Sequence, residues 1–264
     1  MNPSELPAEL RDALHGVRNR LGPLTSAPLY FPIIGSTNDV ALSAGREGAV
    51  VIADEQSAGR GRRGHTWFSP AGSGLYVSVV LAPARASREA DRAVRLQTIA
   101  AGVAIAEGIE ASTGLRVALK WPNDLFLARR KLGGILAEAT SQHADLVVVG
   151  YGLNVAAAAY PPDLADRVTS IETELGRRVD RFTVLAETLV AIASRYGDLL
   201  EGRFDAILDA WRGRSPGASG ARVSWTDSAG EHRGVTDGVA NDGALLVRVD
   251  GRQERIVAGT ITWQ

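Results

Sequence analysis

Two kinds of hydrophobic spacing alternate along this chain, and their order restricts the possible fold more than any other feature. Residues 87–109 and about 182–200 carry apolar side chains at helical spacing, and a further short helix is expected through Trp211. Between the two long helices lie four short runs of strand-forming residues, which are 117–121, 125–127, 132–137 and 146–149. The sequence around Arg129-Arg130 predicts a hairpin between two of them. This order predicts a mixed α+β domain.

The N-terminal part of the chain adds elements of the same two kinds. A helix is expected over residues 4–21, where Gly22-Pro23 would end it. The first expected strand, at 30–34, runs into Gly35-Ser36-Thr37-Asn38, and Ser36 or Thr37 would cap a short helix over residues 39–44. Two further strands are expected at 49–53 and 75–81.

The composition changes after Arg214. Ser215-Pro216-Gly217 predicts a linker, and five brief β-runs separated by turn residues follow it. These runs cover residues 222–225, 233–239, 244–249, 252–257 and 260–263. Turn signals at this spacing predict a small all-β barrel of about 45–50 residues. We therefore expect an N-terminal segment (1–26), a main domain (27–215) and a C-terminal barrel (216–264).

The overall composition excludes several classes of protein. The 29 basic and 30 acidic side chains nearly cancel, which argues against a protein that binds nucleic acid over its whole surface. Cysteine is absent, so disulfides, thiolate nucleophiles and cysteine-bound metals are excluded, and the four histidines are not spaced as metal ligands. No apolar run approaches the roughly 20 residues of a membrane helix, and the acidic N-terminus is unlike a signal peptide. We expect a soluble cytoplasmic protein without a membrane partner.

Only two of the 29 basic residues are lysines, Lys120 and Lys131. A chain so rich in arginine is expected to keep lysine where a compact ammonium group must approach a phosphate or a carboxylate, because the two residues are not interchangeable there. Both lysines lie in distinctive segments, Lys120-Trp121-Pro122-Asn123-Asp124 and Arg129-Arg130-Lys131-Leu132-Gly133-Gly134. The alternative is that two lysines have survived a general bias towards arginine.

The hexapeptide Gly59-Arg60-Gly61-Arg62-Arg63-Gly64 formally matches the dinucleotide-binding pattern and nearly matches a phosphate-binding P-loop. Both motifs require a helix directly afterwards, and residues 66–74 do not have a helical pattern. Three arginines so close together repel one another unless an anion lies nearby, and the glycines allow the backbone to approach a ligand. The hexapeptide therefore predicts a mobile cationic loop that closes over a phosphorylated or adenylated ligand. The alternative is a solvated basic loop that contacts RNA.

Six separated segments together resemble the biotin–protein ligases. They occur in the order and with the spacing of that family, over about residues 30–215, although each alone is a weak to moderate signal. The segments are Ser36-Thr37-Asn38, Glu55-Gln56-Ser57-Ala58-Gly59-Arg60-Gly61-Arg62-Arg63-Gly64, Trp67-Phe68-Ser69-Pro70, Lys120-Trp121-Pro122-Asn123-Asp124, Arg130-Lys131-Leu132-Gly133-Gly134-Ile135-Leu136-Ala137-Glu138 and Gly150-Tyr151-Gly152-Leu153-Asn154.

The resemblance implies a two-step reaction. The carboxylate of biotin attacks the α-phosphate of Mg·ATP to give biotinoyl-5′-AMP and pyrophosphate, and a lysine of an acceptor protein then attacks the acyl carbon and releases AMP. The implied partner is the biotin carboxyl carrier domain of a biotin-dependent carboxylase, and either a monomer or a homodimer is compatible with the sequence. The implied fold is a catalytic domain like that of class II aminoacyl-tRNA synthetases, followed by an SH3-like β-barrel. Mg²⁺ would be carried on the phosphates, so no protein metal site is implied.

The resemblance also assigns cations to the adenylation step. A carboxylate must approach a phosphate, and charge develops on the phosphoryl oxygens as pyrophosphate leaves. Lys131 and Arg60 are the predicted catalytic cations, with Lys131 on the carboxylate and α-phosphate oxygens. The predicted ATP-binding residues are Arg60, Arg62, Trp67, Lys120, Asn123 and Asn154. Trp67 would cover the ligand, or it is an ordinary core aromatic residue.

Biotin and its acceptor require two further sets of groups. The oxygen and the two N–H groups of the ureido ring need partners when they are buried. The predicted biotin-binding residues are Ser36, Thr37, Asn38, Gln56, Arg60, Gly61, Arg62 and Lys131. Asp124 is the third predicted catalytic residue, because a positioned carboxylate would help to deprotonate the acceptor lysine. The sequence Pro122-Asn123-Asp124 also suits a plain tight turn.

Other functions stay open. A lipoate–protein ligase or transferase of the same fold group would use a related lysine, but it is not expected to carry the arginine-glycine hexapeptide. A non-catalytic nucleotide- or RNA-binding module would need further basic and aromatic clusters, which we do not find. Some biotin–protein ligases bind DNA through an N-terminal winged helix-turn-helix. The 26 residues before the predicted catalytic region are too few for that module, so no DNA partner is expected.

Overall fold

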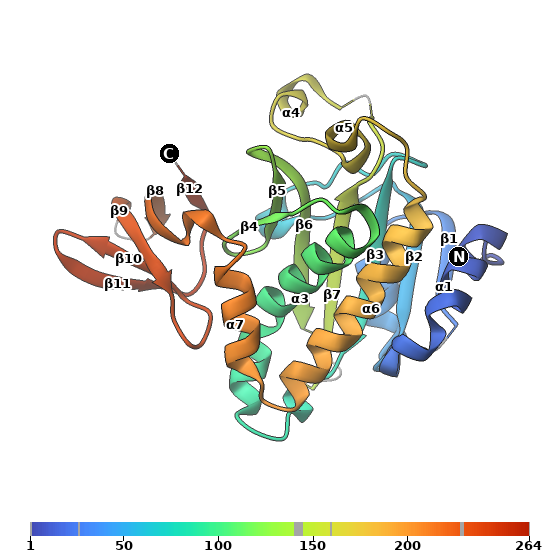
Figure 1. The fold of residues 1–264 in the computed structure, drawn as a ribbon, viewed down its shortest axis with the longest axis horizontal. Coiled ribbons are helices and arrows are strands. Elements are labelled where there is room, and N and C mark those ends of the chain that lie inside the picture. The colour runs from blue at the N-terminus through green and yellow to red at the C-terminus, as the bar shows by residue number, and fades with distance from the viewer. Residues whose placement is uncertain (1, 26, 140–144, 159, 228–229, 264) are drawn as a thin grey trace.

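A seven-stranded mixed sheet forms the centre of the main domain (Figure 1). The structure is a computed structural model, and it describes residues 2–25, 27–139, 145–158, 160–227 and 230–263. The strand order is β1-β2-β3-β7-β6-β5-β4, in which β1 and β2 are parallel and the other neighbours are antiparallel. The strands are β1 (Leu29–Ile34), β2 (Val50–Gln56), β3 (Gly74–Leu81), β4 (Ala118–Lys120), β5 (Asp124–Leu127), β6 (Arg130–Ala139) and β7 (Val147–Asn154).

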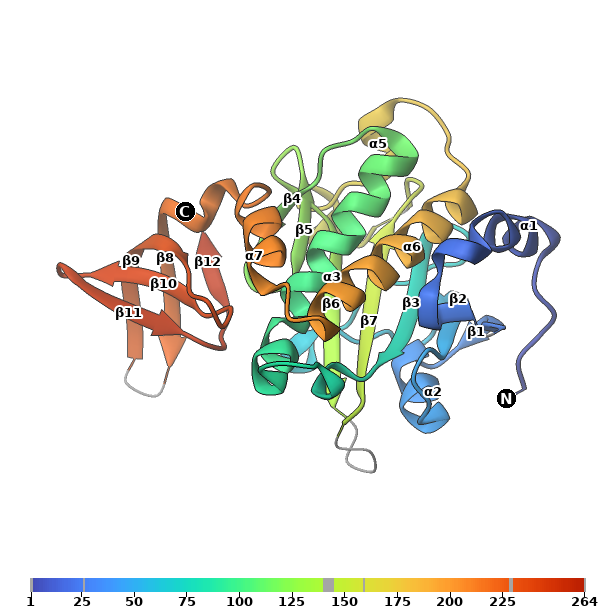
Figure 2. The same ribbon diagram turned by 60° about the horizontal axis from the view of Figure 1, so that its bottom comes forward.

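Two long helices cover one face of this sheet, α3 (Ala90–Thr113) and α6 (Arg181–Leu200) (Figures 1 and 2). They pack closely where Gly108 faces Thr188, since a Cβ built on Gly108 would lie 2.5 Å from the Cα of Thr188. The Thr188 hydroxyl lies 3.0 Å from the buried hydroxyl of Tyr151 on β7. The helix pair is thereby fixed to one face of the sheet.

The short helix α2 (Thr37–Ala44) packs on the opposite face. Side chains alternate between the two faces of a strand. Val79 and Val149 therefore belong to the large core under α3 and α6, whereas their neighbours Val80 and Val148 join a smaller apolar cluster with Ala41 of α2. This arrangement places the N-terminal end of α2 beside β3 and β7.

Most of the predicted elements are confirmed within a few residues, including the hairpin, whose turn residues Ala128 and Arg129 both have positive φ. The N-terminal helix is shorter than expected, because Ser4 pairs with Tyr30 of β1 and Pro7 occupies the N-cap. The remaining helices are α1 (Ala8–Val17), α4 (Pro162–Ala165), α5 (Ile171–Leu175) and α7 (Phe204–Arg212). The sequence did not predict α4 and α5. Within the described ranges, no helix is both long and apolar enough to cross a membrane.

The C-terminal part of the chain forms a separate five-stranded antiparallel sheet (Figure 2). Its strands are β8 (Ser219–Asp227), β9 (Gly230–Val239), β10 (Leu245–Val249), β11 (Arg252–Ile256) and β12 (Ile261–Trp263). Their order is β11-β10-β9-β8-β12, and among the described residues the two edge strands are not paired with each other. The five predicted strands are thus confirmed, but the sheet is not a closed barrel, because closure requires hydrogen bonds between its edges. The expected linker is a short 3-10 turn, Pro216–Ala218.

Candidate active site

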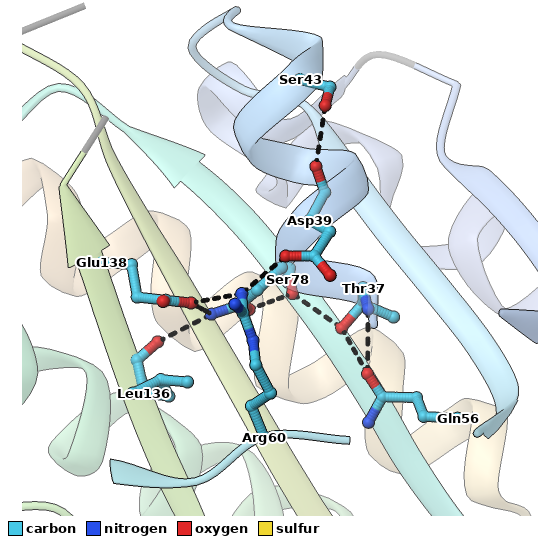
Figure 3. Close-up of polar contacts among 9 residues, drawn as sticks. Thr37, Asp39, Ser43, Gln56, Arg60, Ser78, Leu136 and Glu138 are labelled. Atoms are coloured by element: carbon cyan, nitrogen blue, oxygen red, sulfur yellow. Dashed lines mark hydrogen bonds and ion pairs between the residues drawn. The ribbon is translucent and has the colours of Figure 1, made fainter. Parts of the chain in front are cut away.

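A chain of hydrogen bonds crosses the N-terminal end of α2 (Figure 3). The side-chain oxygen of Gln56, at the end of β2, accepts from the backbone N–H of Thr37 at 2.9 Å and from its hydroxyl at 3.1 Å. The hydroxyl of Ser78 on β3 lies 2.8 Å from Oγ1 of Thr37 and 2.6 Å from Oδ1 of Asn38. Gln56 in turn donates to Ser69 at 3.0 Å. The fold therefore brings together three of the predicted biotin-binding residues.

This series of hydrogen bonds contains more acceptor oxygens than donor protons. Ser78 has one hydroxyl proton, yet Oγ1 of Thr37 and Oδ1 of Asn38 both lie within hydrogen-bond distance of it. The hydroxyl proton of Thr37 is already directed at Gln56. Among the described residues, one of the two oxygens is therefore left without a donor. A ligand N–H can bond to the oxygen that Ser78 does not serve, so this place suits a ligand that brings N–H groups.

From Asn38 the hydrogen bonds continue, through Glu138, to the arginine-glycine loop (residues 59–64). Nδ2 of Asn38 donates to Oε2 of Glu138 on β6 at 2.6 Å, and Arg60 donates to the same oxygen at 3.0 Å. Arg60 also forms a 2.8 Å ion pair with Asp39 (Figure 3). The predicted cation Arg60 is therefore held by two carboxylates that the sequence did not single out as site residues.

The other predicted residues of this region lie close by. Ser36 is buried at the N-cap of α2, and its side chain makes no capping hydrogen bond. Gly61 lies in the loop, where its N–H donates to the carbonyl of His65 at 2.7 Å. Arg63 has a positive φ of 54° and donates to the hydroxyl of Thr260, just before β12 in the C-terminal part, at 3.3 Å. The loop thus contacts both parts of the protein.

Beneath these side chains, β6 and β7 carry glycines, so only the backbone of the two strands lies there. A Cβ on Gly150 would lie 2.0 Å from Oδ1 of Asn38, and a Cβ on Gly152 would lie 2.2 Å from Nε1 of Trp67. A Cβ on Gly134 would lie 3.5 Å from Cζ3 of the same indole ring. Trp67 is half-buried, it belongs to neither apolar cluster, and its indole N–H has no hydrogen-bond partner among the described residues. This placement favours the interpretation of Trp67 as a ligand cover over that of a core residue.

A second group of predicted residues gathers at the β5–β6 hairpin. Nζ of Lys131 lies 2.6 Å from Oδ1 of Asp124 and 5.6 Å from the centre of the Trp67 ring. Lys120 lies 5.2 Å from the ring centre of Phe126 and 5.7 Å from that of Trp263. Burial lowers the pKa of Lys120 below its ordinary value, an effect that Asp124 opposes and the charge of Lys131 reinforces. The two lysines of the chain therefore share one site.

Arg62 connects the loop to this second group. Its guanidinium donates to Oδ1 of Asn123 at 3.2 Å, and Asn123 donates to the carbonyl of Ile135 at 2.7 Å. Burial lowers the pKa of the Arg62 guanidinium, and the neighbouring Arg63 lowers it further. The peptide bond between Trp121 and Pro122 is cis. Asn123 thus has a supporting contact with β6 as well as its contact with the loop.

Asn154 is the last of the predicted ATP-binding residues. It is buried at the end of β7, and its amide donates to the carbonyl of Thr169 at 3.0 Å. The N–H of Thr169 donates to the carbonyl of Lys131 at 2.9 Å. In this structure Asn154 therefore anchors the segment that runs beside Lys131, and its contact with ATP stays a prediction.

Four residues of the network were not predicted from the sequence: Asp39, Ser69, Ser78 and Glu138. Three of them carried a usable signal. Ser78 interrupts a strand whose other residues are apolar, aromatic or glycine, and Ser69 and Glu138 each belong to one of the six segments of the resemblance. Their roles could not be assigned without the strand order that places β3, β7 and β6 side by side.

Comparison with known proteins places the chain in a family. Residues 30–154 match the model of the biotin/lipoate A/B protein ligase family. The bifunctional ligase/repressor BirA of Bacillus subtilis is 30% identical over 241 residues, which cover 88% of this chain and 73% of that protein. The biotin--[acetyl-CoA-carboxylase] ligase of Paracoccus denitrificans is 34% identical over 236 residues, which cover 86% of this chain and 96% of that protein.

The fold gives the same result. The biotin protein ligase of Aquifex aeolicus, solved in complex with biotin and ATP, superimposes with a TM-score of 0.79 at 26% identity, over 90% of this chain and 99% of that one. Sequence and fold agree over most of the chain. The chain therefore belongs to the biotin/lipoate A/B protein ligase family, among its biotin–protein ligases.

Proposed function

We propose that this protein activates biotin with ATP and transfers it to a lysine of an acceptor protein. In the first step an oxygen of the biotin carboxylate bonds to the α-phosphorus of Mg·ATP, and pyrophosphate leaves. In the second step the neutral amine of the acceptor lysine bonds to the acyl carbon, AMP leaves with the bonding electrons, and the amine loses a proton. The products are a biotinylated protein, AMP and pyrophosphate.

The shortage of protons beside Asn38 is the observation that carries this proposal. The ureido ring of biotin brings two N–H donors, and one of them can satisfy the oxygen of Thr37 or Asn38 that lacks a donor. The hydroxyl of Ser36, which makes no capping bond, can donate to the ureido oxygen. The dithiolane ring of lipoate has no N–H donor, so the same place favours biotin over lipoate.

The cations of the second group suit the adenylation step. Lys131 contacts the biotin carboxylate and the α-phosphate, Lys120 the nucleotide, and Arg60 and Arg62 close the loop over the adenylate. Cations aimed at a phosphoryl group stabilise the charge that develops as pyrophosphate leaves. Arg60, Lys131 and Arg62 each contact a polar protein partner, and we propose that a bound substrate replaces these partners. Asn123 and Asn154 hold the nucleotide side of the site.

Asp124 serves the transfer step. While it is paired with Lys131, its carboxylate is occupied. Binding of ATP and biotin draws Lys131 towards the new anions, and the carboxylate then accepts a hydrogen bond from the incoming acceptor lysine. As a general base, the carboxylate takes the proton that the amine loses when it attacks the acyl carbon.

The finer architecture and the partners belong to the same proposal. The main domain, residues 27–215, is a catalytic domain like that of class II aminoacyl-tRNA synthetases, after an N-terminal segment (1–26), and residues 216–264 form an open sheet of the SH3-like type. The contact of Arg63 with Thr260 and that of Lys120 with Trp263 support a role of this sheet at the site. The proposed acceptor is a biotin carboxyl carrier domain, DNA is not a partner, and the protein acts in the cytoplasm.

Exchange of labelled pyrophosphate into ATP tests the proposal without the acceptor protein. The reaction is run with Mg²⁺ and with no acid, biotin or lipoate, and exchange is expected only with biotin. Thr37→Ala should raise the KM for biotin about tenfold, because a hydrogen bond to the ligand is lost. Ser43→Ala is the matched control, since Ser43 lies on the same helix and bonds only to its own turn. Exchange with lipoate alone, or with neither acid, would overturn the proposal.

A further inference from the structure

Glu138 joins two parts of the site that are distant in the sequence. It lies near the end of β6, and its Oε2 accepts both from Nδ2 of Asn38 at 2.6 Å and from Arg60 at 3.0 Å (Figure 3). Asn38 belongs to the proposed biotin pocket on α2, and Arg60 to the arginine-glycine loop. One carboxylate oxygen therefore contacts both the biotin-binding helix and the arginine loop.

The first contact determines the orientation of the Asn38 amide. An ionised carboxylate has only acceptor atoms, so the atom of Asn38 that lies 2.6 Å from Glu138 must be the amide nitrogen. Oδ1 then faces Ser78 and Gly150, where it can accept a hydrogen bond from an N–H group of the proposed ligand. In the flipped orientation two oxygens would oppose each other at that distance. Glu138 thus keeps an acceptor, and not a donor, in the proposed pocket for the ureido ring.

The second contact holds the loop. The same guanidinium nitrogen of Arg60 lies 3.0 Å from Glu138 and 2.8 Å from Asp39. Asp39 is mostly exposed, with 59% of its side chain accessible, whereas Glu138 is only 28% exposed. Glu138 is therefore the less solvated of the two carboxylates and the one that also contacts Asn38. An incoming carboxylate or phosphate must compete with it for Arg60.

We infer that Glu138 is a positioning residue that orients Asn38 for the biotin head group and holds the arginine loop through Arg60 until an anionic ligand replaces it. The inference rests on the proposed function for its first half, the orientation of a biotin-binding amide. The second half concerns the ligand-free protein and stands apart from the activity. Glu138 itself is not placed in contact with the reacting atoms.

Two substitutions separate the two roles. Glu138→Gln keeps an oxygen that can accept from Asn38 but removes the charge that attracts Arg60, and Glu138→Ala removes both. Glu187→Gln and Glu187→Ala are the matched controls, because Glu187 forms a comparable pair with Arg20 at 2.9 Å and takes no part in the site. Circular dichroism melting establishes that each variant is folded before it is used.

The loop is tested by limited trypsin digestion of ligand-free protein, with cleavage after Arg60, Arg62 and Arg63 followed by mass spectrometry. Both Glu138 variants should be cut about two- to fivefold faster than the parent protein, which is the expected effect of losing one partly exposed ion pair. The Glu187 variants should be cut at the parent rate. Unchanged cleavage in both Glu138 variants would show that Glu138 does not hold the loop.

The orientation of Asn38 is tested by calorimetric titration with biotin. Glu138→Ala should weaken biotin about tenfold, whereas Glu138→Gln should bind close to the parent affinity. Only the alanine variant removes the short contact of the Asn38 amide at 2.6 Å and leaves its nitrogen with the longer contact to the Leu136 carbonyl at 3.4 Å. Equal losses in the two variants would contradict this role. If the parent protein binds no biotin, the proposed function fails at that point, and the digestion still decides whether Glu138 holds the loop.

Discussion

The ammonium group of Lys131 lies 2.6 Å from a carboxylate oxygen of Asp124. These two side chains have different tasks in the proposed reaction, the first in adenylation and the second in transfer. Because each neutralises the other in the ligand-free protein, neither is available until a substrate separates them. In the proposed mechanism an anion that draws Lys131 away releases Asp124, so that adenylation precedes transfer.

Lys131→Ala should abolish biotin-dependent pyrophosphate exchange, with a loss of at least about a hundredfold, because a cation aimed at the reacting phosphate is removed. Lys131→Arg should behave in the same way, because a planar guanidinium is too broad for the position. Asp124→Asn should keep exchange but slow transfer to an acceptor protein by about a hundredfold or more. Arg233→Ala, at an exposed cation of the C-terminal sheet, is the control. Parent activity in Lys131→Ala would remove this residue from the mechanism.

Arg60→Ala and Arg62→Ala should release the adenylate before transfer, because the loop that closes over it loses its cations. The measurement is biotin labelling of an added bystander protein, which should rise in both variants. Arg233→Ala, at the exposed cation of the C-terminal sheet used above, is again the control. If labelling stays confined to the acceptor in the first two variants, the loop is not a lid.

Much of the fold was predictable from local patterns, and much of the site was not. The long helices and the strands are confirmed because apolar spacing and turn residues act over a few positions. The contact between Asn38 and Glu138 joins residues 100 positions apart and depends on the strand order, which no local pattern encodes. The open C-terminal sheet was missed for the same reason, because barrel closure depends on whether its two edge strands meet.

Gly152→Ala should displace Trp67, because the added Cβ would lie 2.2 Å from its indole nitrogen. We expect a loss of about 1–3 kcal/mol in the free energy of unfolding, together with weaker ATP binding. Gly197→Ala is the matched control, because Gly197 lies within α6 with nothing within 4 Å of its added Cβ. That change should stabilise the protein by about 0.5–1 kcal/mol. Denaturant unfolding and ATP titration measure both variants, and equal behaviour would contradict the prediction.

The affinity for ATP should fall at alkaline pH because of Lys120. Burial lowers the pKa of this lysine. The attraction between its ammonium group and the phosphates of ATP is complete below the lowered pKa and is lost as the pH rises through it. The loss therefore begins at a lower pH than for an ordinary lysine. In Lys120→Arg the charge persists, and the loss attributable to this position, up to about tenfold, should disappear. ATP titrations from neutral pH to about pH 10 compare the two slopes, and parallel slopes would exclude Lys120 as the titrating group.

Trp263→Ala should weaken ATP binding about two- to fivefold while biotin binding stays unchanged, because the ring 5.7 Å from Lys120 no longer supports that ammonium group. Val257→Ala, at a 76% exposed position of the same C-terminal part, is the control. Calorimetric titration with each ligand measures the effect. An equal loss for biotin and ATP would indicate general damage to the fold and not a local role.

The bare backbone at Gly150 and Gly152 makes the proposed pocket adjustable in one direction only. Glycine is already the smallest residue, so every substitution at these two positions reduces the volume of the pocket and none can increase it. A selection for variants that accept a bulkier analogue of biotin should therefore return changes on α2 or in the arginine loop, and never at these glycines. A selection for smaller acids would have to shift Asn38 or Trp67 as well, because an added Cβ would lie 2.0 Å from Oδ1 of the first or 2.2 Å from Nε1 of the second.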